Sequence, residues 1–382
     1  MQSYQSRSRP FGNRQAGGFA PRSGGFSYGG RPAFRPGVRR MSTFDPTRVI
    51  ENAAKAPIKN DVVEHEIKHS FEDFALEPRI KQNISYHGYT TPTPIQDKAI
   101  PELLLGKDVI GIANTGTGKT AAFLLPILNK IYKNQSERAL IIVPTRELAV
   151  QILDECKAFS GGLNIYSVLC IGGASMQYQR SGLRRDPHIV IGTPGRLNDL
   201  CEQGYLKYNH YGTIVLDEVD RMLDMGFIKD VKFIIDQLPQ QRQSLFFSAT
   251  HAPAVQQIMN AFLKEPVFIS VKTRETADNV DQKVVRVTGR QKFDVLFEHL
   301  QDSDFKKVLV FGRTKFGINK LANMLYDKGV TVAALHGNKT QSQRQFALQQ
   351  FKQNRVRVLL ATDLASRGLD ISDITHVINY DL

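Results

Sequence analysis

Residues 113–120 read Ala-Asn-Thr-Gly-Thr-Gly-Lys-Thr, a composition typical of a phosphate-binding loop. Gly116 and Gly118 let backbone N–H groups approach a phosphate closely, and the helix that the loop opens adds positive potential at its N-terminus. Lys119 can reach the β- and γ-phosphates of a nucleotide, and the Thr120 hydroxyl can ligate Mg²⁺. The first position is alanine where the strict pattern has glycine, so this loop is a variant. The spacing predicts a nucleotide site, and a plain glycine-rich helix start is the alternative.

An acidic pair directly follows the apolar run 213–216. The carboxyl ends of parallel strands meet at one edge of a sheet, where open α/β sheets bind their ligands. At that edge Asp217 can hold Mg²⁺, often through water, and Glu218 can orient and deprotonate an attacking water molecule. An acidic pair after a strand is, taken alone, more often a solvated turn. Together with the upstream loop, it predicts the second half of a nucleotide-hydrolysing site.

The elements that must position these residues alternate between short apolar runs and helical periodicity, which predicts parallel sheets with helices on their faces. Between the first two runs, apolar residues from Phe123 to Ile131 recur at helical spacing and predict a helix. The polar stretch 272–283 predicts a linker between two α/β lobes. Predicted strands lie at 108–113, 139–143, 189–192, 213–216, 245–247 and 267–271, and after the linker at 284–287, 307–311, 331–335, 355–361 and 376–380.

Length and composition restrict the class of protein. The 382 residues suit two or more domains, with 41% hydrophobic and 23% charged residues. The sequence has no apolar run of the roughly 20 residues that span a bilayer, and its N-terminus has no apolar core of the kind a secretory signal needs. The cysteines Cys156, Cys170 and Cys201 form no CxxC pair. We therefore predict a cytoplasmic protein in a reducing compartment, without a disulfide framework or a cysteine-zinc site.

The net charge of +13 is concentrated at the N-terminus, because residues 1–40 contain eight arginines and no lysine or acidic residue. The same segment holds eight glycines, four prolines and interspersed tyrosines and phenylalanines. Such a composition buries too little apolar surface to offset its ordering entropy, so we predict disorder over 1–42. Arginines neutralise phosphates and aromatic rings stack on unpaired bases, which favours contact with nucleic acid. A solubilising tail is the alternative.

The pattern H-E-x-x-H at 65–69 matches that of zinc proteases. Zinc chemistry there needs a helix that brings His65 and His69 together, a third ligand and a cleft. The segment lies instead in a polar lead-in, predicted to span 43–70, and the sequence offers no third ligand. We interpret the match as coincidental.

The order and spacing of several motifs resemble those of the DEAD-box RNA helicase family over residues 71–382. The acidic motif reads Asp-Glu-Val-Asp at 217–220, with valine where the family has alanine. Phe71 and the segment 88–96, Gly-Tyr-Thr-Thr-Pro-Thr-Pro-Ile-Gln, resemble the adenine-reading Q motif. The resemblance implies two RecA-like lobes in tandem, at 71–271 and 284–382, with ATP and Mg²⁺ as cofactors. It also implies that Gln96 selects adenine, because an amide offers one donor and one acceptor side by side.

The resemblance further implies roles for sets of residues. Those expected to bind the nucleotide are Phe71, Gln96, Thr115, Gly116, Thr117, Gly118, Lys119, Thr120 and Asp370. Those expected to act in hydrolysis are Lys119, Asp217 and Glu218, with Thr120 and Asp217 on the metal. Those expected to hold the RNA backbone are Pro144, Thr145, Arg146, Gly172, Gly173, Thr193, Pro194, Gly195, Arg196, Arg313, Thr314, His336, Gly337 and Thr362. Those expected to couple the ATP state to lobe closure are Ser248, Ala249 and Thr250.

Three matches in the second lobe complete the resemblance. Residues 310–314 resemble the fourth family motif, and 361–370 is a close match to motif V. His-Gly at 336–337, with Gln341 and Arg344, resembles the segment between them, although asparagine replaces the usual aspartate at position 338. Arginine and hydroxyl side chains suit contacts with phosphates, which carry no sequence information. The expected RNA contact is therefore independent of base sequence.

The sequence departs from the family at its end, because it stops at Leu382 before an arginine-rich HRxGRxGR motif. Arginines of this motif contact the γ-phosphate, and an arginine finger is worth roughly 10³–10⁵ in rate. The same segment supplies the last strands and a helix of the second lobe, so we expect an uncovered sheet edge. The sequence leaves two interpretations open, a fragment of a longer product or a chain with crippled turnover.

The function predicted from these features is that of an ATP-dependent RNA helicase. ATP and RNA would close the lobes on a single strand and separate a short duplex, and hydrolysis would reopen them. RNA is the expected partner, with ribonucleoprotein components as further candidates. A non-catalytic ATP- and RNA-binding protein with negligible turnover is the alternative. A DNA-directed helicase is a third candidate, because it shares the nucleotide motifs.

Overall fold

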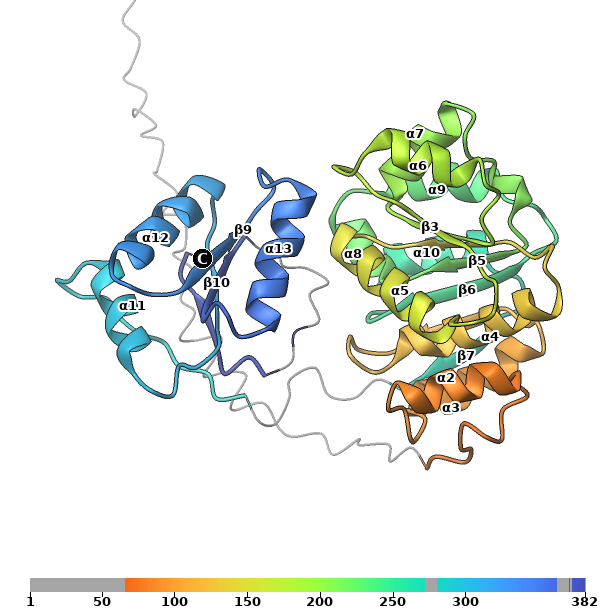
Figure 1. Ribbon diagram of the computed structural model, residues 1–382, viewed down its shortest axis with the longest axis horizontal. Helices are drawn as coiled ribbons and strands as arrows, with labels where there is room; N and C mark the ends of the chain where they lie inside the picture. The colour runs from red at the N-terminus through yellow and green to blue at the C-terminus, as the bar shows by residue number, and fades with distance from the viewer. Residues whose placement is uncertain (1–65, 272–279, 363–370, 372, 382) are drawn as a thin grey trace, which may run out of the picture. The chain divides into compact units, whose positions relative to one another are not determined.

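The computed structural model describes residues 66–271, 280–362, 371 and 373–381. The predicted tail, most of the lead-in with His65, most of the linker, and Asp370 with the rest of 363–370 lie outside the described residues. Two separate parallel β-sheets, each with helices packed against it, make up the described chain (Figure 1). This arrangement confirms the predicted α/β class. None of the described helices has the length and apolar content that crossing a bilayer requires.

The first sheet has seven parallel strands in the order β3-β4-β2-β5-β6-β1-β7. Its inner strands are continuous apolar runs buried along their whole length, because helices cover both faces of the sheet. The strands are β1 Val109–Ile112, β2 Ala139–Ile142, β3 Ser167–Cys170, β4 Ile189–Gly192, β5 Thr213–Leu216, β6 Gln243–Ser248 and β7 Val267–Ser270.

Two hydrophobic cores lie on the two faces of this sheet, and successive strand residues alternate between them. Val109 belongs to one core and Ile110 to the other. The first core is closed by α2 Pro78–Tyr86, α3 Pro94–Leu104, α4 Lys119–Lys133 and α5 Arg146–Phe159. The second is closed by α7 Pro194–Glu202, α8 Val219–Asp224, α9 Ile228–Asp236 and α10 Pro253–Phe262, with the short η1 Tyr208–His210. The helix α6 Met176–Leu183 packs beside β3. Helix α4 confirms the helix predicted from the apolar spacing.

The second sheet has four parallel strands in the order β11-β8-β10-β9. They are β8 Val308–Phe311, β9 Val332–Leu335, β10 Val358–Ala361 and β11 His376–Asn379. Helices α11 Lys292–Gln301 and α12 Lys315–Asp327 close one core of this sheet. Helix α13 Gln341–Lys352 closes the other, with the buried Phe351 ring at its centre.

The predicted strands differ from the observed ones in two places. The run 284–287 was predicted as a strand, but it forms no ladder with any described strand, and Val284, Val285 and Val287 are each at least 37% exposed. A β-branched run becomes a strand only where a partner pairs with it, so the prediction was wrong there. Conversely, β3 is a strand that the sequence did not predict. It lies at the sheet edge, and only Val168 and Cys170 of its residues are fully buried, so its apolar signal is weak.

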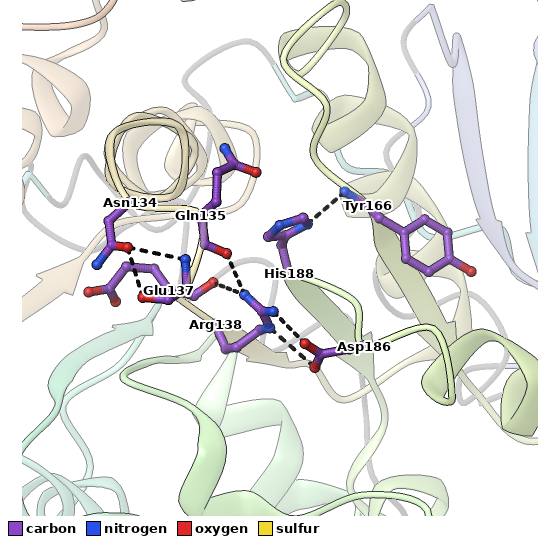
Figure 2. Close-up of polar contacts among 8 residues, drawn as sticks. Asn134, Gln135, Glu137, Arg138, Tyr166, Asp186 and His188 are labelled. Carbon is purple, nitrogen blue, oxygen red and sulfur yellow. Dashed lines mark hydrogen bonds and ion pairs between the residues drawn. The ribbon is translucent and has the colours of Figure 1, made fainter.

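Polar groups at the amino ends of β2, β3 and β4 are bonded to one another (Figure 2). Arg138 donates from Nη1 to the carbonyl oxygens of Gln135 and Glu137 and pairs through Nε and Nη2 with Asp186. The backbone N–H of Tyr166 donates to His188 Nδ1 at 3.1 Å. These bonds fasten the connections that enter three neighbouring strands, at the edge of the sheet opposite to the phosphate loop.

Candidate functional site

Three adjacent strands end in the residues predicted to bind and hydrolyse the nucleotide. In the sheet, β6 lies between β1 and β5. The phosphate loop follows β1, and the acidic pair follows β5. The predicted coupling residue Ser248 ends β6, and its carbonyl accepts the Ala113 N–H at 3.1 Å. The parallel topology therefore brings together residues that are more than a hundred positions apart in sequence.

The other coupling residues lie beyond this strand end. The Ser248 hydroxyl is buried and accepts the backbone N–H of Thr250 at 3.3 Å. Ala249 is half-buried and Thr250 is exposed. A change in the phosphate loop thus has a direct hydrogen-bonded route through Ser248 into the chain that follows β6.

The phosphate loop turns sharply into α4. Gly116 and Gly118 have φ angles of 78° and 89°, a region that side chains other than glycine rarely adopt. The Thr117 hydroxyl donates to the Asn114 carbonyl at 2.8 Å and closes the turn. Lys119 is buried at the first position of α4, and its Nζ donates to the Ala113 carbonyl at 3.0 Å. Thr115 is exposed and Thr120 is half-buried at the mouth of the loop. The loop thus holds an ammonium group beside a helix N-terminus, the combination that binds phosphates.

Gln96 links the predicted adenine site to the phosphate loop. Its Nε2 donates to the Gly118 carbonyl at 3.0 Å, and its Oε1 accepts the Thr93 N–H at 3.0 Å. A Cβ on Gly118 would overlap Gln96 Nε2, so the glycine is required by close approach as well as by φ. The sequence did not predict this bond between amide and loop. Phe71 packs edge-on against Phe74 and Tyr89 in the core, and its contact with a nucleotide stays a prediction.

The acidic pair is buried and electrostatically strained. Asp217 is 2% exposed, and its Oδ1 accepts the Glu218 N–H at 2.9 Å. Glu218 has a left-handed backbone with φ of 54°, and its Oε2 lies 3.0 Å from Arg221 Nη1. Burial raises the pKa of Asp217, and Lys119 opposes that rise. Burial and the neighbouring Asp217 carboxyl raise the pKa of Glu218 to about 7. A carboxyl group with such a pKa is suited to exchanging a proton at neutral pH.

The oxygens gathered here fit Mg²⁺ as a ligand set. Hard divalent cations prefer carboxylate and hydroxyl oxygens, which Asp217 and Thr120 supply. The buried Asp217 carboxyl lacks solvation, and a cation bound beside it would restore the lost stabilisation of its charge. The donor chemistry and the burial therefore suit a cation, and the metal position itself stays a prediction.

The remaining half of the same edge carries the residues predicted to hold RNA. Strands β2, β4 and β3 are consecutive in the sheet, and each runs into one of the predicted segments. The Arg146 guanidinium lies over the glycine pair, since a Cβ on Gly172 would be 2.9 Å and one on Gly173 2.6 Å from its nitrogens. Burial, with Arg344 and Arg196 nearby, lowers the pKa of Arg146. The pair of glycines thus leaves room for a cationic side chain at the strand ends.

Helices α5 and α7 begin at two of the predicted threonines. Thr145, which follows Pro144, is the N-cap of α5, and its hydroxyl accepts the Leu148 N–H at 3.2 Å. Thr193 is the N-cap of α7, which begins at Pro194 and continues with the half-buried Gly195. Arg196 follows in the first turn, and its Nε and Nη1 are buried without a hydrogen-bond partner within the described residues, although Nε forms an ion pair with Asp199 Oδ2 at 3.6 Å. Buried guanidinium nitrogens that lack hydrogen bonds are costly, which suits a site that receives an anion.

The predicted residues of the second sheet gather at its carboxyl edge. Arg313 and Thr314 follow β8, and the Thr314 hydroxyl accepts the Gly317 N–H as the N-cap of α12. His336 and the exposed Gly337 follow β9. Thr362 follows β10, and its N–H donates to the Leu335 carbonyl at 3.2 Å.

His336 is fixed rather than exposed. Its Nε2 lies 2.9 Å from Asn319 Oδ1, and its Nδ1 accepts the Asn338 N–H at 3.3 Å. Burial and nearby cationic side chains lower the pKa of His336, which favours the neutral ring that can accept at Nδ1. Within the described residues, its imidazole therefore supports the chain that follows β9.

Two polar residues of α13 were matched to a motif but given no role by the sequence. Arg344 Nε donates to Glu147 Oε1 at 2.7 Å, and both side chains are buried. Gln341 is 4% exposed, and neither amide atom has a hydrogen-bond partner within the described residues. The bond between Arg344 and Glu147 could not be found in the sequence, because a pairing across nearly two hundred residues leaves no local pattern.

Comparison with known proteins gives concordant matches. The sequence model of the DEAD/DEAH box helicase family matches residues 93–258, and that of the helicase conserved C-terminal domain matches residues 291–382. The ATP-dependent RNA helicase CshA of Listeria monocytogenes is 43% identical over 314 residues, covering 82% of this chain and 60% of that protein. The DEAD-box ATP-dependent RNA helicase CshA of Geobacillus kaustophilus is 41% identical over 315 residues, covering 82% and 68%. The chain therefore spans less than two thirds of the length of the Listeria protein.

A solved structure extends the likeness to the fold. A variant of Saccharomyces cerevisiae Dbp5, bound to RNA and ADP BeF3, is 29% identical with a TM-score of 0.72. The match covers 82% of this chain and 81% of that chain.

Proposed function

The chain belongs to the DEAD-box helicase family, and from that premise we propose that it acts as an ATP-dependent RNA helicase. In this proposal it binds single-stranded RNA without regard to base sequence and separates short duplexes. ATP binding favours the RNA-bound arrangement, and hydrolysis releases the strand. The observation that carries the proposal is the meeting of phosphate loop, Ser248 and acidic pair at three adjacent strand ends.

The residues of this edge divide the work of hydrolysis. Lys119 exchanges its bond with the Ala113 carbonyl for the β- and γ-phosphates, while the loop N–H groups hold the phosphate oxygens. Glu218 accepts a proton from the attacking water, and the water oxygen bonds to the γ-phosphorus while the bond from that phosphorus to the β–γ bridging oxygen breaks and ADP leaves with the electron pair. Asp217 and Thr120 would hold Mg²⁺, which would neutralise charge on the phosphates.

Gln96 recognises the adenine base and is hydrogen-bonded to the phosphate loop. Its amide now bonds to the Gly118 carbonyl and the Thr93 N–H. The Nε2 group has a second N–H and Oε1 a second lone pair, so Gln96 can pair with adenine while it keeps these two bonds. Base recognition is thereby tied to the part of the loop that holds phosphate.

RNA is held at the other half of the edge. Arg146 and Arg196 supply cations to the RNA phosphates, and the glycine pair at 172–173 lets the strand approach closely. The buried nitrogens of Arg196, of which Nε now has only an ion pair with Asp199, gain hydrogen bonds when a phosphate arrives, and this gain in free energy is specific to the bound state.

Substitution of Lys119 tests the proposal. We expect Lys119→Ala to reduce RNA-stimulated phosphate release by about 10² or more, because it removes a preorganised cation from the transferring phosphate. The measurement is phosphate release from Mg²⁺-ATP with and without single-stranded RNA. The control is Lys133→Ala, which removes an exposed lysine from the last turn of the same helix. RNA-stimulated release at the unaltered rate in Lys119→Ala would contradict the proposed role, and no stimulation in the unaltered chain would contradict the proposed activity.

A further inference from the structure

We propose that the exposed face of α6 and the residues that follow it form an additional RNA-binding surface that extends the path beyond the glycine pair. We call this surface the α6 stripe, and it consists of Gln177, Tyr178, Ser181, Arg184 and Arg185. The inference rests on the proposed function, because it takes RNA to pass Gly173. The inference identifies the surface that would hold an RNA strand too long for the carboxyl edge of the sheet alone.

The members of the α6 stripe share one side of the helix. Helical neighbours recur every 3.6 residues, so Gln177, Ser181 and Arg184 align, with Tyr178 and Arg185 beside them. All five residues are exposed, while Gln179 and Leu183 on the opposite side are buried. Tyr178 is 80% exposed, so its ring is accessible to a ligand. An exposed ring beside arginines is the combination that stacks on unpaired bases.

The arginines at the end of the stripe carry charge that no described ion pair neutralises. Within the described residues, neither Arg184 nor Arg185 forms an ion pair, and the exposed Asp186 that follows them pairs with Arg138 instead. Aromatic rings steady both groups instead. Arg184 Cζ lies 5.5 Å from the Tyr205 ring centroid, and Arg185 Cζ lies 4.9 Å from that of Tyr166. A guanidinium held by a ring keeps its N–H donors for phosphate oxygens.

Arg180 adds a third cation at the border of the stripe. Its Cζ lies 4.8 Å from the same Tyr205 ring, and its side chain donates to Gln203 Oε1. Its Nε is buried without a hydrogen-bond partner within the described residues. Three arginines therefore lie over the C-terminal half of α6 and the residues that follow it.

The stripe is fastened to the predicted RNA path. The buried Gln179 donates from Nε2 to the carbonyl oxygens of Ile171 at 3.0 Å and Ala174 at 3.3 Å, on either side of the glycine pair. The Ser175 hydroxyl caps the helix by accepting the Tyr178 N–H. A strand lying on Gly173 thus finds the Tyr178 ring within the next turn of the chain. The whole of α6 is eight residues long, or about 12 Å, and it leads to the arginines.

These observations favour RNA over an acidic protein segment as the occupant. The stripe begins where RNA is already expected, and it offers an exposed ring together with unpaired cations. An acidic segment would form ion pairs with the arginines but would gain nothing from the Tyr178 ring at the start of the helix. Because the contacts are with phosphates and base faces, the surface is indifferent to sequence.

The test compares a short and a long RNA. Binding of uridine homopolymers of about 6 and about 20 nucleotides is measured with the full chain, Mg²⁺ and a non-hydrolysable ATP analogue. We expect Arg184→Ala/Arg185→Ala to lower the affinity for the long RNA more than for the short one. The slope of log affinity against log salt for the long RNA should fall by about 1.4, since each lost phosphate contact removes about 0.7. Tyr178→Ala should weaken long-RNA binding about five-fold or more without changing that slope.

A matched charge change provides the control. Lys229→Ala/Lys232→Ala removes two exposed cations from α9 in the same part of the chain. Thermal unfolding of each variant shows that the fold is retained. Equal losses in the control and in the arginine variant, or unaltered long-RNA binding as an acidic protein ligand would predict, overturn the inference while the proposed function stands. If the unaltered chain binds neither RNA, both the inference and the proposed function fail.

Discussion

The two edges of the seven-stranded sheet use similar polar residues in opposite ways. At the amino edge, Arg138 directs its nitrogens to two carbonyl oxygens and one carboxylate (Figure 2). Asp108 at the same edge accepts two backbone N–H groups. At the carboxyl edge, Arg196 has two buried nitrogens without a hydrogen-bond partner in the described chain, and Asp217 and Glu218 lie side by side in the interior. The polar groups described at the amino edge are hydrogen-bonded within the protein, whereas several at the carboxyl edge are available to a ligand.

The carboxyl edge is where the protein gives up stability. Buried polar groups are normally hydrogen-bonded, and each exception costs free energy. Such exceptions include Arg196 after β4 and Gln179 beside the glycine pair, with Arg180 farther along α6. We infer that the carboxyl edge is built for bound anions and a cation, and that the amino edge compensates by fastening the same strands.

Substitution of Glu218 should have the largest effect. We expect Glu218→Gln to retain ATP binding but lower turnover by about 10²–10⁴, because the amide cannot accept the proton of the attacking water. The same change should leave the free energy of unfolding unchanged or raise it by about 1 kcal/mol, since it removes one of two adjacent buried carboxyl groups. The measurements are steady-state phosphate release, nucleotide affinity and urea unfolding.

A control at the surface separates this effect from a general loss of charge. Glu202→Gln alters an exposed carboxylate at the end of α7 and should change neither quantity. A Glu218→Gln variant that is markedly less stable than the unaltered chain would break the comparison, because the carboxyl edge would then be contributing to stability.

The sequence carries local patterns for the carboxyl edge but none for the amino edge, and the roles assigned to the residues of the carboxyl edge stay predictions. The phosphate loop and the acidic pair are local patterns, and their chemistry dictates residue types within a few positions. The bonds of Arg138 with Asp186, and of Gln96 with the Gly118 carbonyl, join residues distant in sequence, and only the folded topology reveals them. The edge strand β3 was missed for a related reason, since a strand with two buried residues has little periodicity to detect. The run 284–287 shows the converse, an apolar alternation without a described partner.

Substitution of Asp108 tests the amino edge. Its Oδ1 accepts the Ser244 N–H at 2.7 Å and its Oδ2 accepts the Lys264 N–H at 3.0 Å, which fastens the start of β1 to β6 and to the turn before β7. We expect Asp108→Ala to cost about 2 kcal/mol in the free energy of unfolding, because two backbone donors lose their acceptor. Phosphate release per folded molecule should be unchanged.

The conservative variant Asp108→Asn sharpens this prediction. Asparagine keeps one acceptor oxygen, so its loss of stability should be smaller than that of Asp108→Ala. Urea unfolding monitored by circular dichroism measures both. A large loss of phosphate release in folded Asp108→Ala would show that the amino edge also serves the chemistry, against the division drawn here.

The smallest effect is expected at the Arg138–Asp186 pair. Asp186 is 77% exposed in its side chain, so solvent screens the pair and its contribution to stability should be below about 1 kcal/mol. Asp186→Asn is the suitable change, because the residue has a φ of 48° and asparagine tolerates that region well.

The pH dependence of this pair follows from the pKa of Asp186, which the hydrogen bonds and charge of Arg138 lower. The contribution of the pair to stability is therefore present above the ordinary aspartate pKa of about 3.9 and is lost as the pH falls through the lowered value. The stability difference between Asp186→Asn and the unaltered chain should therefore be the same at pH values of about 7 and about 5 and shrink below about 4. A difference that changes between about pH 7 and pH 5 would point to a titrating neighbour such as His188 as the real source of stability at this edge.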